Sequence, residues 1–461
     1  MISRRILLLL ALATTFLAAF TPLCAEDTPA PTDAAKQFKG LMAEFRALRG
    51  REWRALGDYS HTSGLMIFAS QDDAMATKLG CPPEKGRKYT QGIEQPDEVA
   101  KVTEWGRRRT RMLTTVREKG LEILDWCTEN FKNGLKEAAT AIFEELPDEE
   151  RAHKAIGQVY SEELGWVSGE DAENVKKGLL PWGRDWLERS KVVELRRDWA
   201  NAWEVPSKNF MARTNTSPAL ARDLLKFLEA LRAEYIEYFG EFDFRDKNLR
   251  LGVNLFSDRD AYERNGMILH PAAPSAGAFY YERTGQTYMV AYPVKAGFLF
   301  SEDTVAHEES HQFFGRFFDV MCHKYYDKPG TWVNEALASY CESVMRAADR
   351  VAFVGYRSSY HLNIARSMIQ AGTIFPLRKF VEIDAGPAPG SWERIGMFYS
   401  EGMSLTAFLL QAEGGKHRKG YFRYINDVMA SRGSPKLFAR CFGEEPEEME
   451  PRFFKWIQEM K

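Results

Sequence analysis

The sequence of 461 residues lacks the features that mark several large classes of protein. Its 62 basic residues do not outnumber its 65 acidic ones, so no surplus of positive charge is available for sequence-independent binding of nucleic acid. There is no CxxC pair, which excludes a zinc site built from cysteines. We find no phosphate-binding loop, no dinucleotide fingerprint, no Ser-His-Asp or Cys-His motif and no internal repeat.

Long apolar runs are also missing, except at the N-terminus. Residues 6–20 are apolar and uncharged, follow two arginines, and are succeeded by a proline and by Ala25. This layout predicts a signal peptide over residues 1–25 and an exported protein, periplasmic or extracellular. An uncleaved anchor is the alternative, although the run is short for a bilayer span. No later stretch is long and apolar enough to cross a membrane, so we expect no stable membrane span after cleavage.

The first half of the chain predicts a leader and a helical region. Residues 26–37 are rich in proline, alanine and acidic residues and predict a flexible leader. Residues 38–205 predict a mostly helical domain of unknown role, and eight of the eleven tryptophans lie in it, which indicates a packed core. Its basic run at 107–111 predicts a solvated helix face rather than a patch for an anionic partner.

The pattern changes near residue 206. Residues 209–214 predict a strand, and a long apolar stripe after Ser217 and Pro218 predicts a helix that stops at Gly240. Alternation over 249–255 predicts a half-buried strand, and residues 278–292 predict a hairpin. The predicted fold class is therefore α+β, mainly α, with a helical N-terminal region followed by a domain over 206–461 with a small mixed or antiparallel sheet.

The sequence after the predicted hairpin has the spacing of a metal-binding helix. Ser301 is a suitable N-cap, and acidic residues follow it where the helix dipole favours them. His307 and His311 are four residues apart and share one helix face. Two imidazoles in this arrangement bind zinc, and Glu308 lies beside them, where its carboxylate can act on a water of the metal. The alternative is a helix with two exposed or core histidines.

A third ligand is available downstream. Catalytic zinc sites have three protein ligands and one open position, and two histidines with a glutamate form one of the common sets. Glu335 lies near the start of the next helical stretch, with Asn334 as its expected cap. We therefore expect Glu335 to complete the site; the alternative is an ordinary first-turn glutamate favoured by the helix dipole.

Three segments resemble motifs of the gluzincins, the thermolysin- and aminopeptidase-like zinc metallopeptidases. They are the HExxH sequence, the segment WVNEALA at 332–338, which resembles W-L-N-E-G-x-A, and the segment YSEGMSL at 399–405, which resembles Y-x-x-G-x-x-L. The resemblance covers about residues 206–461 and is nearest to an uncharacterised, exported bacterial branch of the superfamily. The gap between His311 and Glu335 is longer than in the aminopeptidases, and no G-x-M-E-N segment is present. Aminopeptidase specificity is therefore not implied.

The resemblance implies site residues and a metal. Zn²⁺ would be held by His307, His311 and Glu335, with Glu308 as general base, and the hydroxyl of Tyr399 would stabilise the oxyanion. A core tyrosine with a bonded hydroxyl is the alternative for Tyr399. Cys322 and Cys341 follow the two ligand-bearing segments, so we expect either a bridge between them or buried free thiols.

Together these observations predict an exported zinc metallopeptidase that acts on a peptide or protein substrate and binds no nucleic acid. A free edge of the hairpin at 278–292 would pair with an extended peptide. Two alternatives stay open: a metal-binding, non-proteolytic peptide-recognition or cell-envelope module, and a zinc hydrolase of another amide or ester. The presence of Glu308 favours catalysis, because a pure binding module does not need a general base.

Overall fold

The computed structural model describes residues 33–89, 98–240, 250–269, 277–294, 297–317, 328–354, 359–383 and 392–460. The predicted signal peptide at 1–25 lies outside these ranges, as does Cys322. The described chain contains many helices and a few small sheets, so the predicted class, α+β and mainly α, is confirmed.

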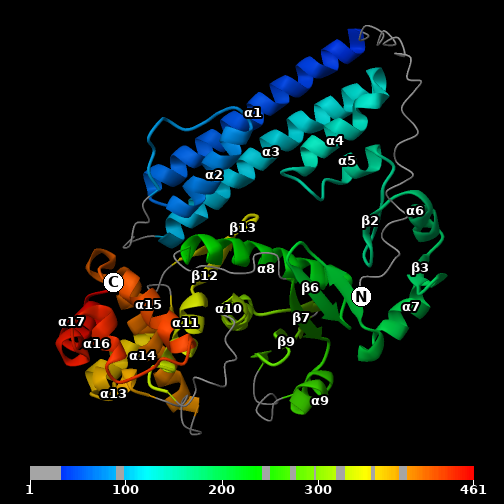
Figure 1. The fold of residues 1–461 in the computed structure, drawn as a ribbon. Coiled ribbons are helices and arrows are strands. Elements are labelled where there is room, and N and C mark those ends of the chain that lie inside the picture. The colour runs from blue at the N-terminus through cyan, green and yellow to red at the C-terminus, as the bar shows by residue number, and fades with distance from the viewer. Residues whose placement is uncertain are drawn as a thin grey trace, which may run out of the picture.

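Helices α1 to α5 form an elongated bundle along one side of the molecule (Figure 1). Large apolar side chains of α1, among them Phe38, Phe45 and Trp53, recur every seven or eight residues and are buried against α2, α3 and α4. The bounds are α1 Asp33–Ser63, α2 Met66–Lys78, α3 Glu98–Asn130, the 3₁₀ turn η1 Lys132–Gly134, α4 Leu135–Phe143 and α5 Glu150–Ala155.

Helix α1 begins inside the predicted leader. The leader was expected over residues 26–37, but Asp33 already lies in the first helical turn. An acidic residue is favoured there by the helix dipole, and the two alanines that follow have the highest helix propensity. The helix therefore takes up residues 33–37.

Two small hairpin–helix units follow the bundle. Each has a two-stranded antiparallel hairpin and then a short helix. A tryptophan is the second residue of the outgoing strand in both: Trp166 in one and Trp186 in the other. The two units share this order of elements but few residue types, so they do not amount to a repeat in the sequence. The bounds are β1 Val159–Ser161, β2 Gly165–Val167, α6 Gly169–Lys176, β3 Leu179–Trp182, β4 Asp185–Glu188, α7 Arg189–Arg196 and η2 Trp199–Asn201.

A five-stranded mixed sheet lies next, in the order β5-β6-β7-β9-β8. Strands β6, β7 and β9 run parallel, while β5 and β8 are antiparallel edge strands. The predicted strand at 209–214, the strand at 249–255 and the hairpin at 278–292 correspond to β6, β7 and β8–β9. The bounds are β5 Trp203–Pro206, β6 Phe210–Thr214, β7 Leu251–Phe256, β8 Ala278–Tyr281 and β9 Gln286–Val290. The predicted boundary at residue 206 falls on the last residue of β5.

The parallel strands β6 and β7 are joined through α8, which begins as predicted with Ser217 as N-cap and Pro218 at its first position. The remaining elements complete the C-terminal half, and Figure 1 shows α13 to α17 gathered at one end of the molecule. Their bounds are α8 Pro218–Tyr238, α9 Arg259–Leu269, β10 Tyr292–Val294, β11 Gly297–Leu299, α10 Glu302–Phe317, α11 Trp332–Cys341, β12 Val344–Ala347, β13 Arg350–Phe353, α12 Tyr360–Ala371, α13 Leu377–Val381, α14 Trp392–Gln411, η6 Ala412–Gly415, α15 Arg418–Met429, α16 Leu437–Phe442 and α17 Pro446–Glu459.

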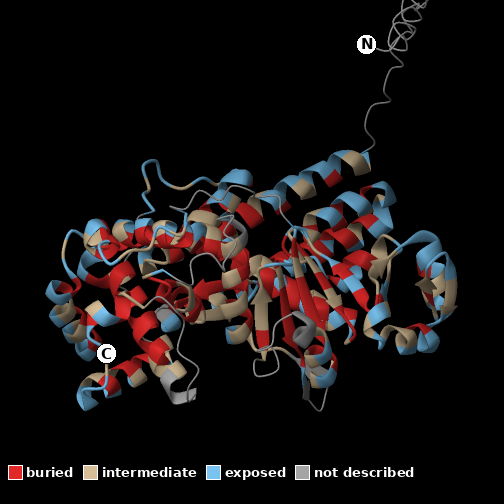
Figure 2. Cartoon of the chain, turned by 60° about the horizontal axis from the view of Figure 1, so that its bottom comes forward, coloured by how far each residue is buried: buried red, intermediate tan, exposed pale blue. Residues whose placement is uncertain are grey.

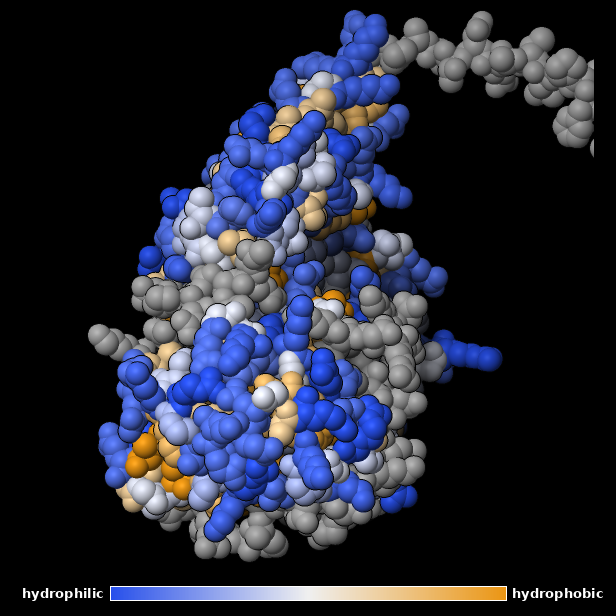
Figure 3. Space-filling view, turned by 60° about the vertical axis from the view of Figure 1, so that its left-hand side comes forward, coloured by the Kyte–Doolittle hydropathy of each residue, from blue (hydrophilic) through white to orange (hydrophobic). Residues whose placement is uncertain are grey.

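Two large groups of buried apolar residues support this arrangement. The central core joins the sheet, α8, α10, α11 and the C-terminal helices, while the bundle core lies among α1 to α5. Figure 2 shows both as buried residues inside a largely exposed outer layer. The face in Figure 3 is mainly hydrophilic, and its apolar side chains form small patches. Within the described ranges, no helix has the length and apolar character that a bilayer crossing needs.

Candidate metal centre

Helix α10 carries the HExxH sequence and is fixed to the core at its first turns. The Ser301 hydroxyl accepts a hydrogen bond from the amide of Thr304 at 3.3 Å, which confirms the predicted N-cap. From α8, the fully buried Tyr235 donates its hydroxyl hydrogen to the carbonyl of Ala306 at 2.7 Å. Ala306 directly precedes His307, so this bond holds the backbone beside the first histidine.

Gln312 ties the same helix to the sheet. Its fully buried side-chain amide donates to the carbonyl of Gly252 on β7 at 2.8 Å and to that of Gly285, in the β8–β9 turn, at 2.9 Å. Because Gln312 follows His311 directly, the second histidine is also held by a backbone segment that is anchored in the interior.

Helix α11 carries the third predicted ligand and is anchored by Trp332. This indole is fully buried, and its Nε1 donates to the hydroxyl of Tyr424 at 3.2 Å. The N-cap is Thr331 rather than Asn334. Asn334 instead lies within the first helical turn, three residues after the N-cap, where its side chain is directed to His311.

The structure brings the three predicted ligands together. The Nε2 atoms of His307 and His311 are 3.2 Å apart, and Oε2 of Glu335 lies 3.3 Å from the first and 3.5 Å from the second. In the described part of the chain, these residues form the one group of three His, Cys, Asp or Glu side chains with the spacing to hold a metal ion.

The other nitrogen of each imidazole is held by an oxygen. Nδ1 of His307 lies 2.7 Å from Oε1 of Glu342, and Nδ1 of His311 lies 3.3 Å from Oδ1 of Asn334. Each ring can donate its Nδ1 hydrogen to these oxygens and keep Nε2 as an acceptor for a metal. The sequence analysis missed Glu342, although it follows Glu335 by seven residues, two helical turns, on the same face.

The charges and hydrogen bonds in this cluster shift the pKa values of Glu335 and His307 in the direction opposite to burial. Burial raises the pKa of the Glu335 carboxyl, but the neighbouring imidazoles of His311 and His307 hold it well below its ordinary value overall. Burial lowers the pKa of His307, but its hydrogen bonds with Glu335 and Glu342 raise it well above its ordinary value overall. The carboxyl of Glu335 is thus ionised, and a proton would compete with a cation for His307.

Glu308 lies between the metal-binding face and the edge of the sheet. Its Oε2 accepts a hydrogen bond from the backbone amide of Tyr280 at 2.7 Å. Tyr280 belongs to β8, the edge strand that packs beside α10. The predicted general base and the outer edge of the sheet therefore face each other.

Tyr399 reaches the same site from α14. Its ring centroid lies 6.0 Å from that of His307. Helix α14 packs tightly on α11 at Gly402, where an added Cβ would lie 2.8 Å from Cβ of Ala336. The glycine of the YxxG segment thus allows the helix that carries Tyr399 to approach the helix that carries Glu335.

A further histidine extends the polar network away from the ligands. Nε2 of His361, on α12, lies 3.5 Å from Oε2 of Glu342, and its Nδ1 lies 2.7 Å from Oγ of Ser400, next to Tyr399. His361 is almost fully buried. No motif in the sequence indicated this residue, because the contact joins helices that are distant along the chain.

The thiol of Cys341 is free and buried in the interior. Burial raises the pKa of this thiol, and Tyr235 and Ser310 are its hydrogen-bonding neighbours. Cys341 is therefore the buried free thiol that was expected as the alternative to a bridge, while Cys322 lies outside the described residues.

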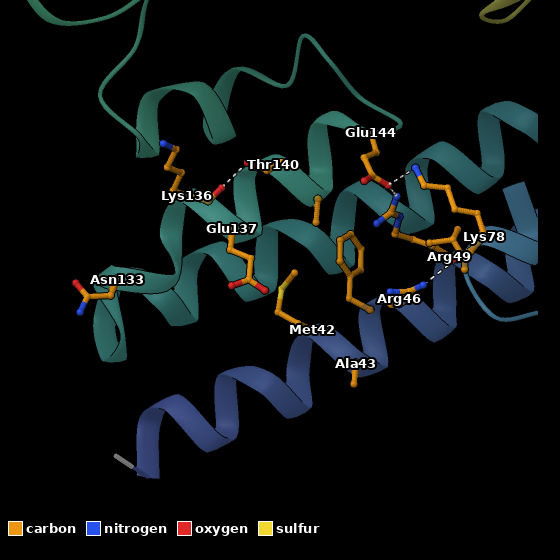
Figure 4. A pocket seen from close by; sticks show the side chains of 13 residues that line it. Met42, Ala43, Arg46, Arg49, Lys78, Asn133, Lys136, Glu137, Thr140 and Glu144 are labelled. Carbon is orange, nitrogen blue, oxygen red and sulfur yellow. Dashed lines mark hydrogen bonds and ion pairs between the residues drawn. The ribbon is translucent and has the colours of Figure 1, made fainter. Parts of the chain in front are cut away.

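A separate groove of about 730 Å³ lies in the helical bundle, between α1, the end of α2 and α4 (Figure 4). Met42 and Phe45 contribute apolar surface to it. At one end, Glu144 forms ion pairs with Arg49 and, at 3.7 Å, with Lys78. None of its lining residues belongs to the metal centre.

Comparison of the chain with known proteins identifies no relative. No model of a protein family matches the chain, and no curated protein matches it. The case for a function therefore rests on the residues and geometry of the site.

Proposed function

We propose that the chain is a zinc-dependent metallopeptidase. The observation that carries this proposal is the mutual spacing of the three ligand atoms, 3.2, 3.3 and 3.5 Å. Zinc bonds to nitrogen and oxygen of about 2.0–2.2 Å in tetrahedral geometry separate the ligand atoms by about 3.3–3.6 Å. Two neutral imidazole nitrogens and one carboxylate also form the donor set that leaves a fourth position open for catalysis.

The surrounding residues suit hydrolysis of an amide. Zinc, when bound at these residues, supplies a Lewis acid that polarises a carbonyl group and lowers the pKa of a water. Glu308 then accepts the proton of the attacking water and transfers it to the leaving amine. The hydroxyl of Tyr399 donates a hydrogen bond to the oxyanion, where charge develops only in the transition state. Glu342 and Asn334 keep the two imidazoles in the required orientation.

The edge of the sheet favours an extended peptide as substrate. Strand β8 is the last strand of its sheet and lies beside α10. An extended chain that pairs with this edge would pass the carboxylate of Glu308, which contacts the amide of Tyr280. Backbone pairing of this kind suits peptides better than small esters.

The proposal is tested by digesting an unbiased peptide library with the purified protein. We expect zinc-dependent cleavage that a chelator abolishes and added zinc restores. The matched variant is Glu308→Gln, which leaves all three ligands in place but cannot accept the proton. Its turnover should fall by about 10²–10⁴ or more, with zinc still bound.

The other outcomes distinguish the alternatives. Bound zinc without cleavage of any peptide would support a non-proteolytic recognition module. Cleavage of other amides or esters, but not of peptides, would support a different zinc hydrolase. If Glu308→Gln cleaves as fast as the parent, the proposed mechanism is wrong even when zinc is present.

A further inference from the structure

The β12–β13 hairpin lies between the two halves of the molecule. Along β13 and the residue after it, successive side chains alternate between two environments: Val351 and Phe353 belong to the central core, whereas Ala352 and Val354 belong to the bundle core. Figure 1 shows the hairpin between the end of the bundle and α8, in agreement with its contacts to α3 and α8. The hairpin is therefore one layer shared by both cores.

Arg350, at the start of β13, is inserted into the bundle. Its Nη1 lies 2.9 Å from Oδ1 of Asp72, which is fully buried on α2. Its guanidinium carbon lies 5.5, 5.4 and 5.1 Å from the ring centroids of Trp53, Phe68 and Trp105. The cation thus has both a charge partner and three aromatic rings around it.

Asp72 joins the hairpin to three helices of the bundle. Besides Arg350, its carboxylate accepts hydrogen bonds from Ser60 on α1 at 2.7 Å and from the indole of Trp105 on α3 at 3.1 Å. A shift of Arg350 would leave this buried carboxylate without its cation, which is costly in the interior. The position of Arg350 is therefore set by the bundle as a whole.

A second ion pair holds the tip of the hairpin. Arg109 on α3 is buried and donates from Nε and Nη2 to the carboxylate of Asp349 at 3.0 and 2.7 Å. The other residues of the basic run at 107–111 are exposed, as expected for a solvated helix face, and Arg109 alone points into the interface. Beside it, Ala348 has a φ of 53°, a left-handed conformation that alanine rarely adopts.

The base of the hairpin adjoins the metal centre. Glu342 is the C-cap of α11 and lies two residues before the hairpin, where the amide of Val344 donates to its carbonyl at 2.8 Å. The amide of Val354, at the other end of the hairpin, donates to the carbonyl of Ser343 at 2.9 Å. Glu342 is also the residue whose carboxylate contacts Nδ1 of His307. Displacement of the hairpin would therefore move the partner of a metal ligand.

We propose that the helical bundle of α1 to α5 is a positioning part of the metal centre. The pair of Arg350 and Asp72 docks the hairpin on the bundle, and the docked hairpin fixes Glu342 against His307. Arg350 is thus a positioning residue that acts through Glu342. This inference rests on the metal centre of the proposed function, but not on its peptidase activity.

The test is the zinc affinity of Arg350→Met in the full chain, measured by competition with a chromophoric chelator. Loss of an outer partner of a metal ligand typically weakens binding by about 10–100-fold, and we expect a loss in this range. Hydrogen exchange should also become faster in α11 and in the hairpin. The matched control is Arg108→Met. Arg108 lies 4.3 Å over the ring of Tyr59 in the same bundle, is more exposed than Arg350, and forms an ion pair with Glu104 on its own helix. Its zinc affinity should equal that of the parent.

Several outcomes would overturn the inference. A folded Arg350→Met protein with the zinc affinity and exchange rates of the parent would show that docking does not position the centre. Lower thermal stability with unchanged zinc affinity would show a purely structural role. If Arg350→Met does not fold, Asp349→Asn removes the charge that pairs with Arg109 at the tip of the hairpin, and a folded Asp349→Asn protein with the zinc affinity of the parent would contradict the inference. A parent that binds no zinc would refute the metal centre itself, which is a distinguishable failure.

Discussion

Glu335 provides the negative charge that the Nε2 atoms of both histidines face. Among the three ligands of the proposed metal centre, its loss should be the most damaging. Glu335→Ala removes a carboxylate from a half-buried site and leaves two imidazoles without their anionic partner. We expect the variant to lose zinc or bind it far more weakly, with lower thermal stability in the presence of zinc. Zinc content after dialysis measures this. Glu459→Ala, at the exposed end of α17, is the control and should retain zinc; equal zinc content in both variants would refute the assignment.

Tyr399 should affect the rate without affecting the metal. Tyr399→Phe keeps the ring beside His307 but removes the hydroxyl, so zinc should stay bound while turnover falls by about 10²–10³, the effect of losing one oxyanion donor. Steady-state kinetics on a cleaved peptide, with zinc content measured in parallel, tests this expectation. Tyr360→Phe is the control, since Tyr360 is exposed on α12. A silent Tyr399→Phe substitution would favour the core-tyrosine alternative.

At this scale the sequence was informative wherever the spacing within one helix determines which side chains meet. His307 and His311 are brought together by a single helical turn, and the structure places Glu335 against both. Glu342 could have been found from its place two turns after Glu335. His361 could not, because its contacts with Glu342 and Ser400 join three separate helices.

At the scale of elements, the close contact of α14 with α11 predicts opposite changes in stability when alanine replaces two different glycines of α14. Gly402→Ala would bring a methyl group to 2.8 Å from Cβ of Ala336. We expect a loss of about 1–3 kcal/mol in the free energy of unfolding, the usual effect of overpacking, and a lower turnover because the helix with Tyr399 is displaced.

Gly396→Ala, in the same helix, is the matched control. A Cβ at Gly396 would meet no atom within 4 Å, so the higher helix propensity of alanine should stabilise the protein by up to about 1 kcal/mol. Urea unfolding of the two variants gives the comparison. Equal stabilisation by both substitutions would contradict the tight packing of α14 on α11.

The elements that the sequence predicted are those with a strong periodic pattern. Helix α8 and strand β7 have clear helical and alternating apolar patterns, and both formed close to their predicted bounds. The β12–β13 hairpin escaped prediction because it is buried between two cores, so both faces of β13 carry apolar residues and no polar alternation marks it.

At the scale of the whole molecule, a buried acid predicts how stability depends on pH. Glu401 on α14 is fully buried, and its Oε2 accepts one hydrogen bond, from the amide of Phe375 at 3.1 Å. Burial raises the pKa of this carboxyl to about 8. In the unfolded chain the pKa of a glutamate is about 4.3. At a pH between this pKa and that of the buried Glu401 carboxyl, the folded protein therefore holds a proton that the unfolded chain releases.

The stabilisation linked to protonated Glu401 is fully present below about pH 4.3. It is lost progressively as the pH rises from there to about 8. Relative to the parent, Glu401→Gln should gain up to about 1.4 kcal/mol of unfolding free energy per pH unit between pH 5 and 8. Urea unfolding at several pH values tests this. Glu447→Gln is the control, because the hydrogen bond with Arg378 lowers the pKa of Glu447 and keeps it ionised over this range. Parallel profiles for the parent and Glu401→Gln would contradict the prediction.

The relation between the two halves could not be derived from the sequence. Composition separates a tryptophan-rich helical region from the domain after residue 206, and this suggests two independent units. The structure instead gives them a shared layer, since Ala347, Ala352 and Val354 belong to the bundle core. Such sharing depends on contacts between residues more than 200 positions apart, such as Arg109 and Asp349.

The most direct test of the central claim is the location of the metal by anomalous X-ray scattering, recorded on both sides of the zinc absorption edge from crystals of the zinc-loaded protein. We predict one strong peak per chain, bonded to Nε2 of His307, Nε2 of His311 and Oε2 of Glu335. A peak at other residues, a peak that excludes Glu335, or no peak in zinc-loaded crystals would contradict the metal centre and the function proposed from it.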